Sequence, residues 1–201
     1  MGRHLASIAP QVDDLFYLLN DSTDDTGQYL HGIPHVEYNT GDPYSDRQRR
    51  SIANMAEVFN KWTDLVLQRD WDYLMLWSSD MVAGPGMVER LYDTHLGLGE
   101  RSVVGPVYPT GERTFNVFEE SNGEYERSPL RNQPWRCFST GCALYPRAAV
   151  ESGARHADVP QGHVFAWYKG LVDEGFEVWA EPRLRVEHHM APDKVYTWDG
   201  R

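Results

Sequence analysis

One short apolar run, Tyr73–Trp77, stands between Asp72 and the polar residues Ser78, Ser79 and Asp80. An unbroken apolar run of this length is typical of a strand that is buried on both faces of a sheet. In open sheets flanked by helices, ligands bind at the carboxyl ends of the strands. We therefore expect Ser78, Ser79 and Asp80 to face a crevice. There, Asp80 is either a ligand for a divalent cation on a phosphorylated molecule or a turn or capping residue.

Apolar periodicity on either side of this run predicts alternating helices and strands. Across residues 46–68, apolar residues recur at intervals of three and four, for example Ile52, Met55 and Phe59, which is typical of an amphipathic helix. We predict further helices at residues 3–9, 85–95, 147–152 and 163–174, and further strands at residues 15–19, 36–38, 102–108 and 176–180. The polar residues 109–134 show no period, which predicts a long loop. This order indicates one α/β domain over residues 1–201.

The composition excludes several classes of protein. The net charge is −11, with 30 acidic against 19 basic residues, which argues against dedicated nucleic-acid binding. No apolar run approaches about 20 residues and no basic-then-apolar leader opens the chain, so we expect no membrane span and a cytoplasmic location. Two cysteines, Cys137 and Cys142, are too few for a disulfide framework and are expected to be reduced thiols.

Three segments, in this order, resemble the family-2-like glycosyltransferases of the GT-A fold, which belong to the nucleotide-diphospho-sugar transferase superfamily. Leu15–Thr26 resembles a strand that ends in an acidic Gly-Ser-Thr-Asp-Gly-Thr turn, although Asp21 stands where glycine is usual. Asp72–Asp80 resembles the strand that ends in the Asp-x-Asp motif. Gly141–His188 resembles the acceptor-side half, which includes Arg147, Gly175-Phe176, Trp179, Glu181-Pro182 and a final histidine.

The resemblance implies a Rossmann-like, mixed but mostly parallel sheet flanked by helices. It also implies a glycosyltransferase of the hexosyltransferase type, which moves a sugar from a nucleotide-diphosphate donor to an unidentified acceptor hydroxyl. The family pattern places Asp80 and His188 on a divalent cation, Mn²⁺ or Mg²⁺. The residues that it places at the donor nucleotide-sugar are Asn20, Asp21, Arg50, Ser78, Ser79, Asp80, Gly141 and Cys142.

Three departures from the family pattern shape these expectations. Ser78 replaces the first acid of the Asp-x-Asp motif, which leaves Asp80 alone. The family's catalytic carboxylate is missing at the start of the helix near residue 162. His163 is there either the general base, since its ordinary pKa lies near neutrality, or a structural histidine, and Asp158 is the nearest acid. The family's first central strand is not found before residues 3–9, so the sheet is expected to be completed in another way.

Two other functions stay open. A catalytically degenerate GT-A module would bind a nucleotide-sugar or a partner without turnover, and Ser78 and the missing acid favour it. A nucleotidyltransferase on a related fold is disfavoured, because such enzymes usually carry a glycine-rich loop and basic residues near the start. The sequence determines neither the sugar nor the oligomeric state.

Overall fold

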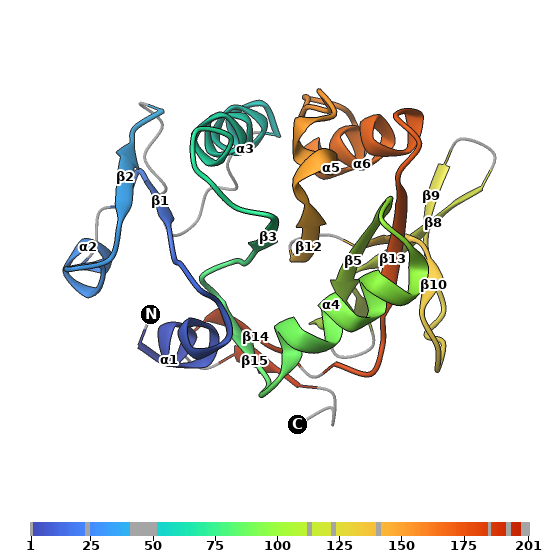
Figure 1. Cartoon of the computed structure of the whole chain (residues 1–201), viewed down its shortest axis with the longest axis horizontal. Helices are drawn as coiled ribbons and strands as arrows, with labels where there is room; N and C mark the ends of the chain where they lie inside the picture. Colours follow the sequence, from blue (N-terminus) through green and yellow to red (C-terminus); the bar gives the residue numbers. More distant parts are fainter. Residues whose placement is uncertain are drawn as a thin grey trace.

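The computed structural model describes residues 2–22, 25–40, 52–111, 114–121, 124–139, 142–184, 186–191 and 194–197. The expected α/β class is confirmed, since helices flank a central sheet (Figure 1). The sheet has the strand order β10 (Trp135–Arg136), β13 (Glu177–Glu181), β5 (Ser102–Pro106), β12 (Ala143–Pro146) and β3 (Tyr73–Leu76). The apolar run of the sequence thus forms β3, at one edge of this sheet.

The expectation of a mostly parallel sheet is wrong. β5 and β13 run parallel, whereas the pairs β10–β13, β5–β12 and β12–β3 are antiparallel. Parallel neighbours need a crossover connection, usually a helix. The chain instead reaches β12 from β5 through a series of short strands between residues 109 and 139, and so enters the sheet in the opposite direction.

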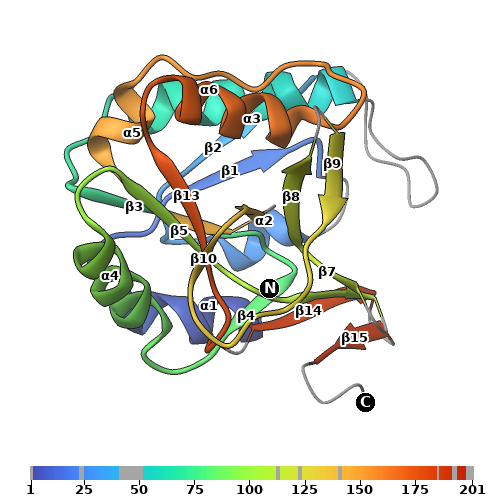
Figure 2. The same ribbon diagram turned by 90° about the vertical axis from the view of Figure 1, so that its right-hand side faces the viewer.

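Helices cover the two faces of the central sheet (Figure 2). On one face lie α3 (Ile52–Val66), α5 (Arg147–Glu151) and α6 (His163–Asp173); on the other lie α1 (Gly2–Ile8) and α4 (Met87–Leu98). The alternation of strand side chains separates the two cores. Val103 and Tyr145 pack in the first core, whereas their neighbours Val104 and Leu144 pack in the second. All the predicted helices are present, and the part of the 46–68 helix before Ile52 lies outside the described residues.

A second, parallel pair of strands lies beside β3. It consists of β1 (Tyr17–Asn20) and β2 (His35–Tyr38), with the short helix α2 (Thr26–Tyr29) between them in the chain. The described part of the chain opens with α1 and the 3-10 turn η1 (Ala9–Gln11), as the prediction of a helix at residues 3–9 requires. α1 packs against β4 (Met81–Ala83).

The predicted long loop is wrong, because residues 109–134 contain four short strands. They are β6 (Pro109–Gly111), β7 (Thr114–Phe115), β8 (Val117–Ser121) and β9 (Glu124–Arg127), and β11 (Phe138–Ser139) adds to β8. The buried Asn116 holds this region in place. Its side-chain oxygen accepts the Tyr108 N–H at 2.8 Å, and its amide group donates to Pro106 O at 3.1 Å. This buried amide and the pairing of β8 with β9 and β11 together order a region that lacks apolar periodicity.

The last strands complete a small antiparallel sheet. β14 (Val186–Ala191) lies between β15 (Lys194–Tyr196) and β4. The strand β4 was not among the strands predicted from the sequence. Within the described ranges, no helix has the length and apolarity that crossing a bilayer requires.

Candidate functional site

Asp80 and His188 lie together, although 108 positions separate them in the chain. Asp80 ends the turn that follows β3, and His188 lies on β14 opposite Met81 of β4. The strand pairing brings the side chains together, with His188 Nε2 at 3.2 Å from Asp80 Oδ2. Backbone pairing continues past them, since the His189 N–H donates to Asp80 O at 2.8 Å. The structure thus brings together the two residues that the resemblance placed on a cation.

The partners of His188 determine where its protons lie. Its Nδ1 is 3.1 Å from Pro109 O, a carbonyl oxygen that can only accept, so Nδ1 carries a proton. Nε2 faces the Asp80 carboxylate, which as an anion also only accepts. Burial alone would lower the pKa of His188, but the hydrogen bond to Asp80, the charge of Asp80 and the hydrogen bond to Pro109 O together outweigh it, and the pKa is raised. Nε2 therefore holds either a proton or, in its place, a cation.

The chemistry of this pair fits a cation that also binds an anionic ligand. The Asp80 side chain is 44% exposed and that of His188 only 10%, so the carboxylate opens toward solvent. A hydrogen bond from Nδ1 to a backbone carbonyl is the arrangement that fixes metal-binding histidines. Among the residues that the structure describes, no cluster of three or more His, Cys, Asp or Glu could hold a metal. A cation here would need further oxygen ligands, such as phosphate and water.

The other predicted residues after β3 have different surroundings. Ser79 is exposed and Ser78 is half-buried, and Ser78 O accepts the Met81 N–H at 3.2 Å to close the turn. Cys142 is fully buried, with Sγ at 3.1 Å from Met81 Sδ, and burial raises the pKa of its thiol. Its side chain therefore packs in the core and lines no open site. Arg50 and Gly141 lie outside the described residues.

Asn20 is the last residue of β1 and Asp21 follows it, and both hydrogen-bond to residues at or just after the end of β2. Asp21 has φ +46°, in the left-handed region where glycine is preferred. Its carboxylate accepts the backbone N–H and the hydroxyl of Thr40, at 2.9 and 2.7 Å, and the Asn20 amide at 2.7 Å. Aspartate is tolerated because these bonds offset the cost of the left-handed backbone.

Replacement of Asp21 tests this structural role. Asp21→Ala is expected to lower the free energy of unfolding by about 2–3 kcal/mol, because it removes hydrogen bonds to a charged group and keeps a side chain at positive φ. Asp21→Gly loses the same bonds without the backbone strain and should cost about 1 kcal/mol less. Urea denaturation measures both. Asp25→Ala, at an exposed acid that caps no helix through its side chain, is the control; equal losses in Asp21→Ala and Asp25→Ala would contradict this role.

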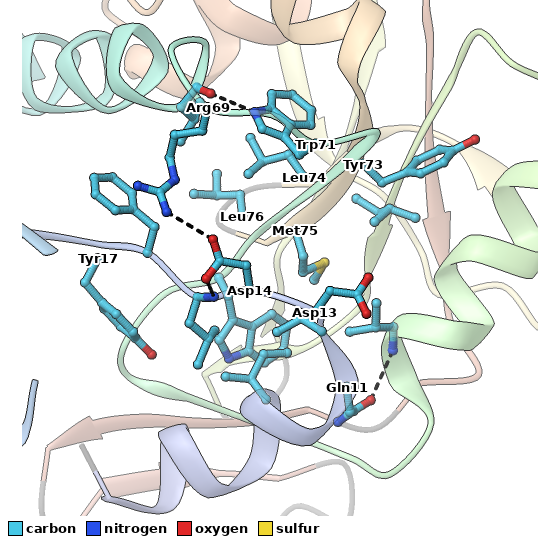
Figure 3. A pocket seen from close by; sticks show the side chains of 18 of the residues that line it. Gln11, Asp13, Asp14, Tyr17, Arg69, Trp71, Tyr73, Leu74, Met75 and Leu76 are labelled. Carbon is cyan, nitrogen blue, oxygen red and sulfur yellow. Dashed lines mark hydrogen bonds and ion pairs between the residues drawn. The ribbon is translucent and has the colours of Figure 1, made fainter. Parts of the chain in front are cut away.

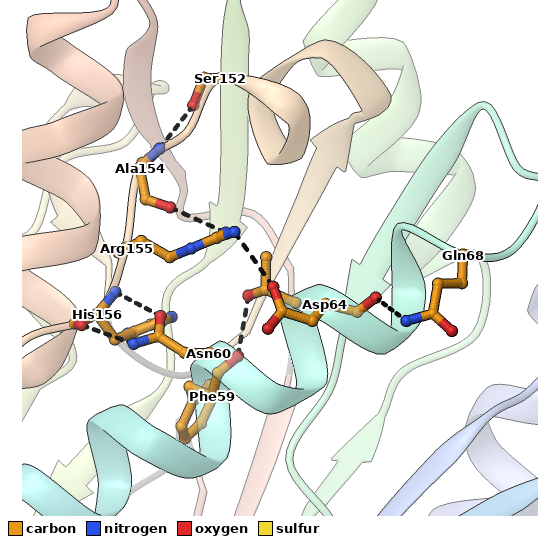
Figure 4. Close-up of polar contacts among 9 residues, drawn as sticks. Phe59, Asn60, Asp64, Gln68, Ser152, Ala154, Arg155 and His156 are labelled. Carbon is orange, nitrogen blue, oxygen red and sulfur yellow. Dashed lines mark hydrogen bonds and ion pairs between the residues drawn. The ribbon is translucent and has the colours of Figure 1, made fainter.

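His163, the predicted general base, lies in a separate cluster between α3 and α6. Its Nδ1 is 3.0 Å from Nδ1 of His156, which was not singled out from the sequence, and its ring packs against Phe59 at 4.8 Å. His156 lies in turn on Trp167, with the ring planes 2° apart. Asn60 holds the His156 backbone through two 2.9 Å hydrogen bonds (Figure 4). Among the described residues, His163 makes no hydrogen bond or ring contact with any other predicted site residue.

The geometry of this histidine pair disfavours His163 as a base. His156 Nδ1 also faces the His163 carbonyl at 3.3 Å, so His156 Nδ1 carries the proton and His163 Nδ1 accepts it. A neutral His163 then carries its own proton on Nε2 and has no free lone pair for an acceptor hydroxyl. Burial lowers the pKa of His163 to about 4. The nearest predicted acid, Asp158, is exposed on the loop before α6.

A cavity beside β3 was not found from the sequence (Figure 3). Its volume is about 460 Å³, and it lies between β3 and the segment that leads into β1. Its walls come from α1, residues 11–17, the end of α3, residues 69–77 and the start of α4. Residues 4–17 and 62–77, together with Val88 of α4 and Leu144 of β12, build it, so no local pattern in the sequence could have indicated it.

The structure is a Rossmann-like α/β fold with a polar turn at the carboxyl end of β3. No protein-family model matches the sequence, and no curated protein matches it. The solved structures that share the fold include the following two. A197 from STIV has a TM-score of 0.56 and 16% identity over 92% of this chain and 93% of its own. The nucleoside-diphosphate-sugar pyrophosphorylase from Vibrio cholerae RC9 has a TM-score of 0.51 and 14% identity over 96% of this chain and 82% of its own. At these identities the likeness establishes the fold alone.

Proposed function

We propose that the chain binds a nucleoside-diphosphate sugar through a divalent cation at Asp80 and His188, and that it transfers the sugar to an acceptor hydroxyl. The observation that carries the proposal is the 3.2 Å distance between His188 Nε2 and Asp80 Oδ2 just beyond the carboxyl end of β3. The two residues follow each other in the chain in the same order as the matching motifs of the glycosyltransferases that the sequence resembles. The fold shared with a nucleoside-diphosphate-sugar pyrophosphorylase supports a nucleotide-sugar ligand. Mn²⁺ or Mg²⁺ would supply Lewis-acid neutralisation of the diphosphate.

The chain's own residues have defined tasks in this proposal. Asp80 offers an exposed carboxylate oxygen, and His188 offers Nε2 from a ring that its Nδ1 bond to Pro109 O keeps fixed. Ser78 and Ser79 offer hydroxyls beside the same turn. Sugar transfer requires that the negative charge of the leaving diphosphate be stabilised. These groups would contribute by positioning the diphosphate beside the cation.

A second candidate is binding of the nucleotide-sugar without turnover. The observation that favours it is the histidine pair, in which His163, expected from the sequence to be the general base, uses the lone pair of its Nδ1 to accept a hydrogen bond from His156. The two candidates share the cation and the donor and differ in whether an acceptor hydroxyl loses its proton. Release of UDP or GDP from the matching nucleotide-sugar distinguishes them, since only a transferase should release it faster than the buffer alone.

Calorimetric titration of the protein with UDP and GDP, with and without Mn²⁺, tests the binding site. We expect one nucleotide to bind only with Mn²⁺, and Asp80→Ala to weaken that binding at least about 100-fold, because it removes a direct ligand of the cation. Mn²⁺ should also displace the proton on His188 Nε2. Titrations near pH 6.5 in buffers of different ionisation enthalpy should therefore reveal proton release.

The exposed acid Glu126 on β9 provides the control. Glu126→Ala keeps full binding if the effect belongs to Asp80. Mn²⁺-independent binding, or equal binding by wild type and Asp80→Ala, would contradict the proposal.

A further inference from the structure

The cavity beside β3 has apolar walls. Side chains that line it include Leu15, Phe16, Trp62, Leu74, Met75 and Trp77. Figure 3 shows the wall formed by Leu74, Met75 and Leu76 on one side and the segment with Asp13, Asp14 and Tyr17 on the other. A space of this size, lined by both apolar and charged residues, can bury apolar side chains of a ligand and contact its polar groups. The Asp80–His188 pair is not among the lining residues, so the cavity is a separate feature.

Two strand edges flank this cavity. Within the described ranges, β3 pairs with β12 alone and β1 pairs with β2 alone. In an antiparallel pair, every second residue directs its N–H and C=O away from the partner strand. Alternate residues of β3 therefore direct their backbone N–H and C=O groups away from β12, toward the side where the cavity lies. Such an edge favours the addition of another extended strand.

The rim of the cavity is acidic. Four exposed carboxylates line it, namely Asp13, Asp14, Asp70 and Asp72. Arg69 pairs with Asp14 at 3.0 Å, from the opposite wall (Figure 3), and lies over the ring of Phe16. Three of the four carboxylates thus have no arginine or lysine partner within salt-bridge distance among the described residues. The rim therefore complements a cationic side chain, while the walls complement apolar ones.

We propose that this cavity accepts an extended segment of a partner protein, which adds as a strand to the free edge of β3. The segment hydrogen-bonds to the outward backbone groups of β3, places alternate apolar side chains against the walls, and directs a lysine or arginine to the carboxylates of Asp13 and Asp70. This interaction is independent of the nucleotide-sugar site, and each can fail without the other.

Selection of random twelve-residue peptides displayed on phage against the whole chain tests the proposal. Enriched peptides should alternate apolar residues and carry a lysine or arginine. A synthetic copy of one should slow deuterium exchange of backbone amides in residues 13–17 and 70–77. N-methylation of alternate peptide amides removes strand hydrogen bonds and should weaken binding roughly 30-fold.

Variants of the rim separate this mode from non-specific binding. Asp13→Lys combined with Asp70→Lys should weaken the peptide about tenfold, since it reverses two exposed charges without changing the core. Glu126→Lys, on β9 away from the cavity, is the matched control and should leave the affinity unchanged. The proposal is overturned if no peptide is enriched, or if deuterium exchange slows only outside residues 13–17 and 70–77. It is also overturned if the N-methylated peptide binds as tightly as the unmodified one, or if the rim variant binds the peptide as tightly as the wild-type protein.

Discussion

Acidification from about pH 7 to about pH 4.5 is expected to lower the free energy of unfolding by about 3–5 kcal/mol through His156 and His163. Burial lowers the pKa of His163 to about 4, and burial with His163 beside it lowers that of His156 to about 3. In the unfolded chain both titrate near 6.5, so the unfolded state takes up protons first as the pH falls. The stability is full above pH 6.5 and is lost progressively below it. The lower end of the expected range, about 3 kcal/mol, allows for solvent screening of the charge on the half-buried His163.

The histidine pair adds a specific reason for this loss. His163 Nδ1 accepts the proton of His156 Nδ1 at 3.0 Å, so protonation of His163 would place two protons between the rings. Urea denaturation at both pH values measures the effect. The His156→Gln, His163→Gln double variant should lose most of the pH dependence, and His31→Gln, at an exposed histidine, should keep it. A double variant with the wild-type pH dependence would show that other groups are responsible.

Leu91→Ala is expected to lower the free energy of unfolding by about 3–5 kcal/mol, because removing a fully buried leucine loses transfer free energy and leaves a cavity. Leu91 is 0% exposed in α4 and packs in the core that contains Val104 and Leu144. The same helix offers a matched control, Leu96, which is 56% exposed. Leu96→Ala should change stability by no more than about 0.5 kcal/mol.

Thermal and urea unfolding of the two leucine variants test how α4 is oriented. Similar losses for Leu91→Ala and Leu96→Ala would mean that α4 does not present the Leu91 face to the sheet. A Leu91→Met variant, which nearly conserves volume, should recover most of the stability, since the core then loses little packing.

Local patterns predicted most elements of this fold. The run Tyr73–Trp77 predicted β3, and the apolar spacing between Ile52 and Val66 predicted α3. The direction of β12 and the pairing of β4 were not predicted, because they depend on neighbours far along the chain. β4 has three residues, too few to show alternation.

The candidate site was predicted only in part. The resemblance named Asp80 and His188, whereas no local pattern connects two residues 108 positions apart. Cys142 stood beside a glycine in a motif, but it directly precedes β12 and its side chain is buried in the core that contains Leu144. His156 was missed because it lies in an irregular segment, and its partners on α3 and α6 give it a structural role that spacing does not reveal.

The pairing of β4 with β14 has a consequence for how the chain would respond to a ligand. β14 is late in the sequence, and its contact with the turn after β3 runs through His188 to Asp80 and through the His189 N–H to Asp80 O. A ligand that binds only when Asp80 and His188 are together favours the state in which β4 and β14 are paired, by mass action. Under the proposed function, saturation with Mn²⁺ and the nucleotide should slow cleavage of the β14–β15 segment by a non-specific protease. The proteolytic lifetime would then measure occupancy without any catalytic turnover.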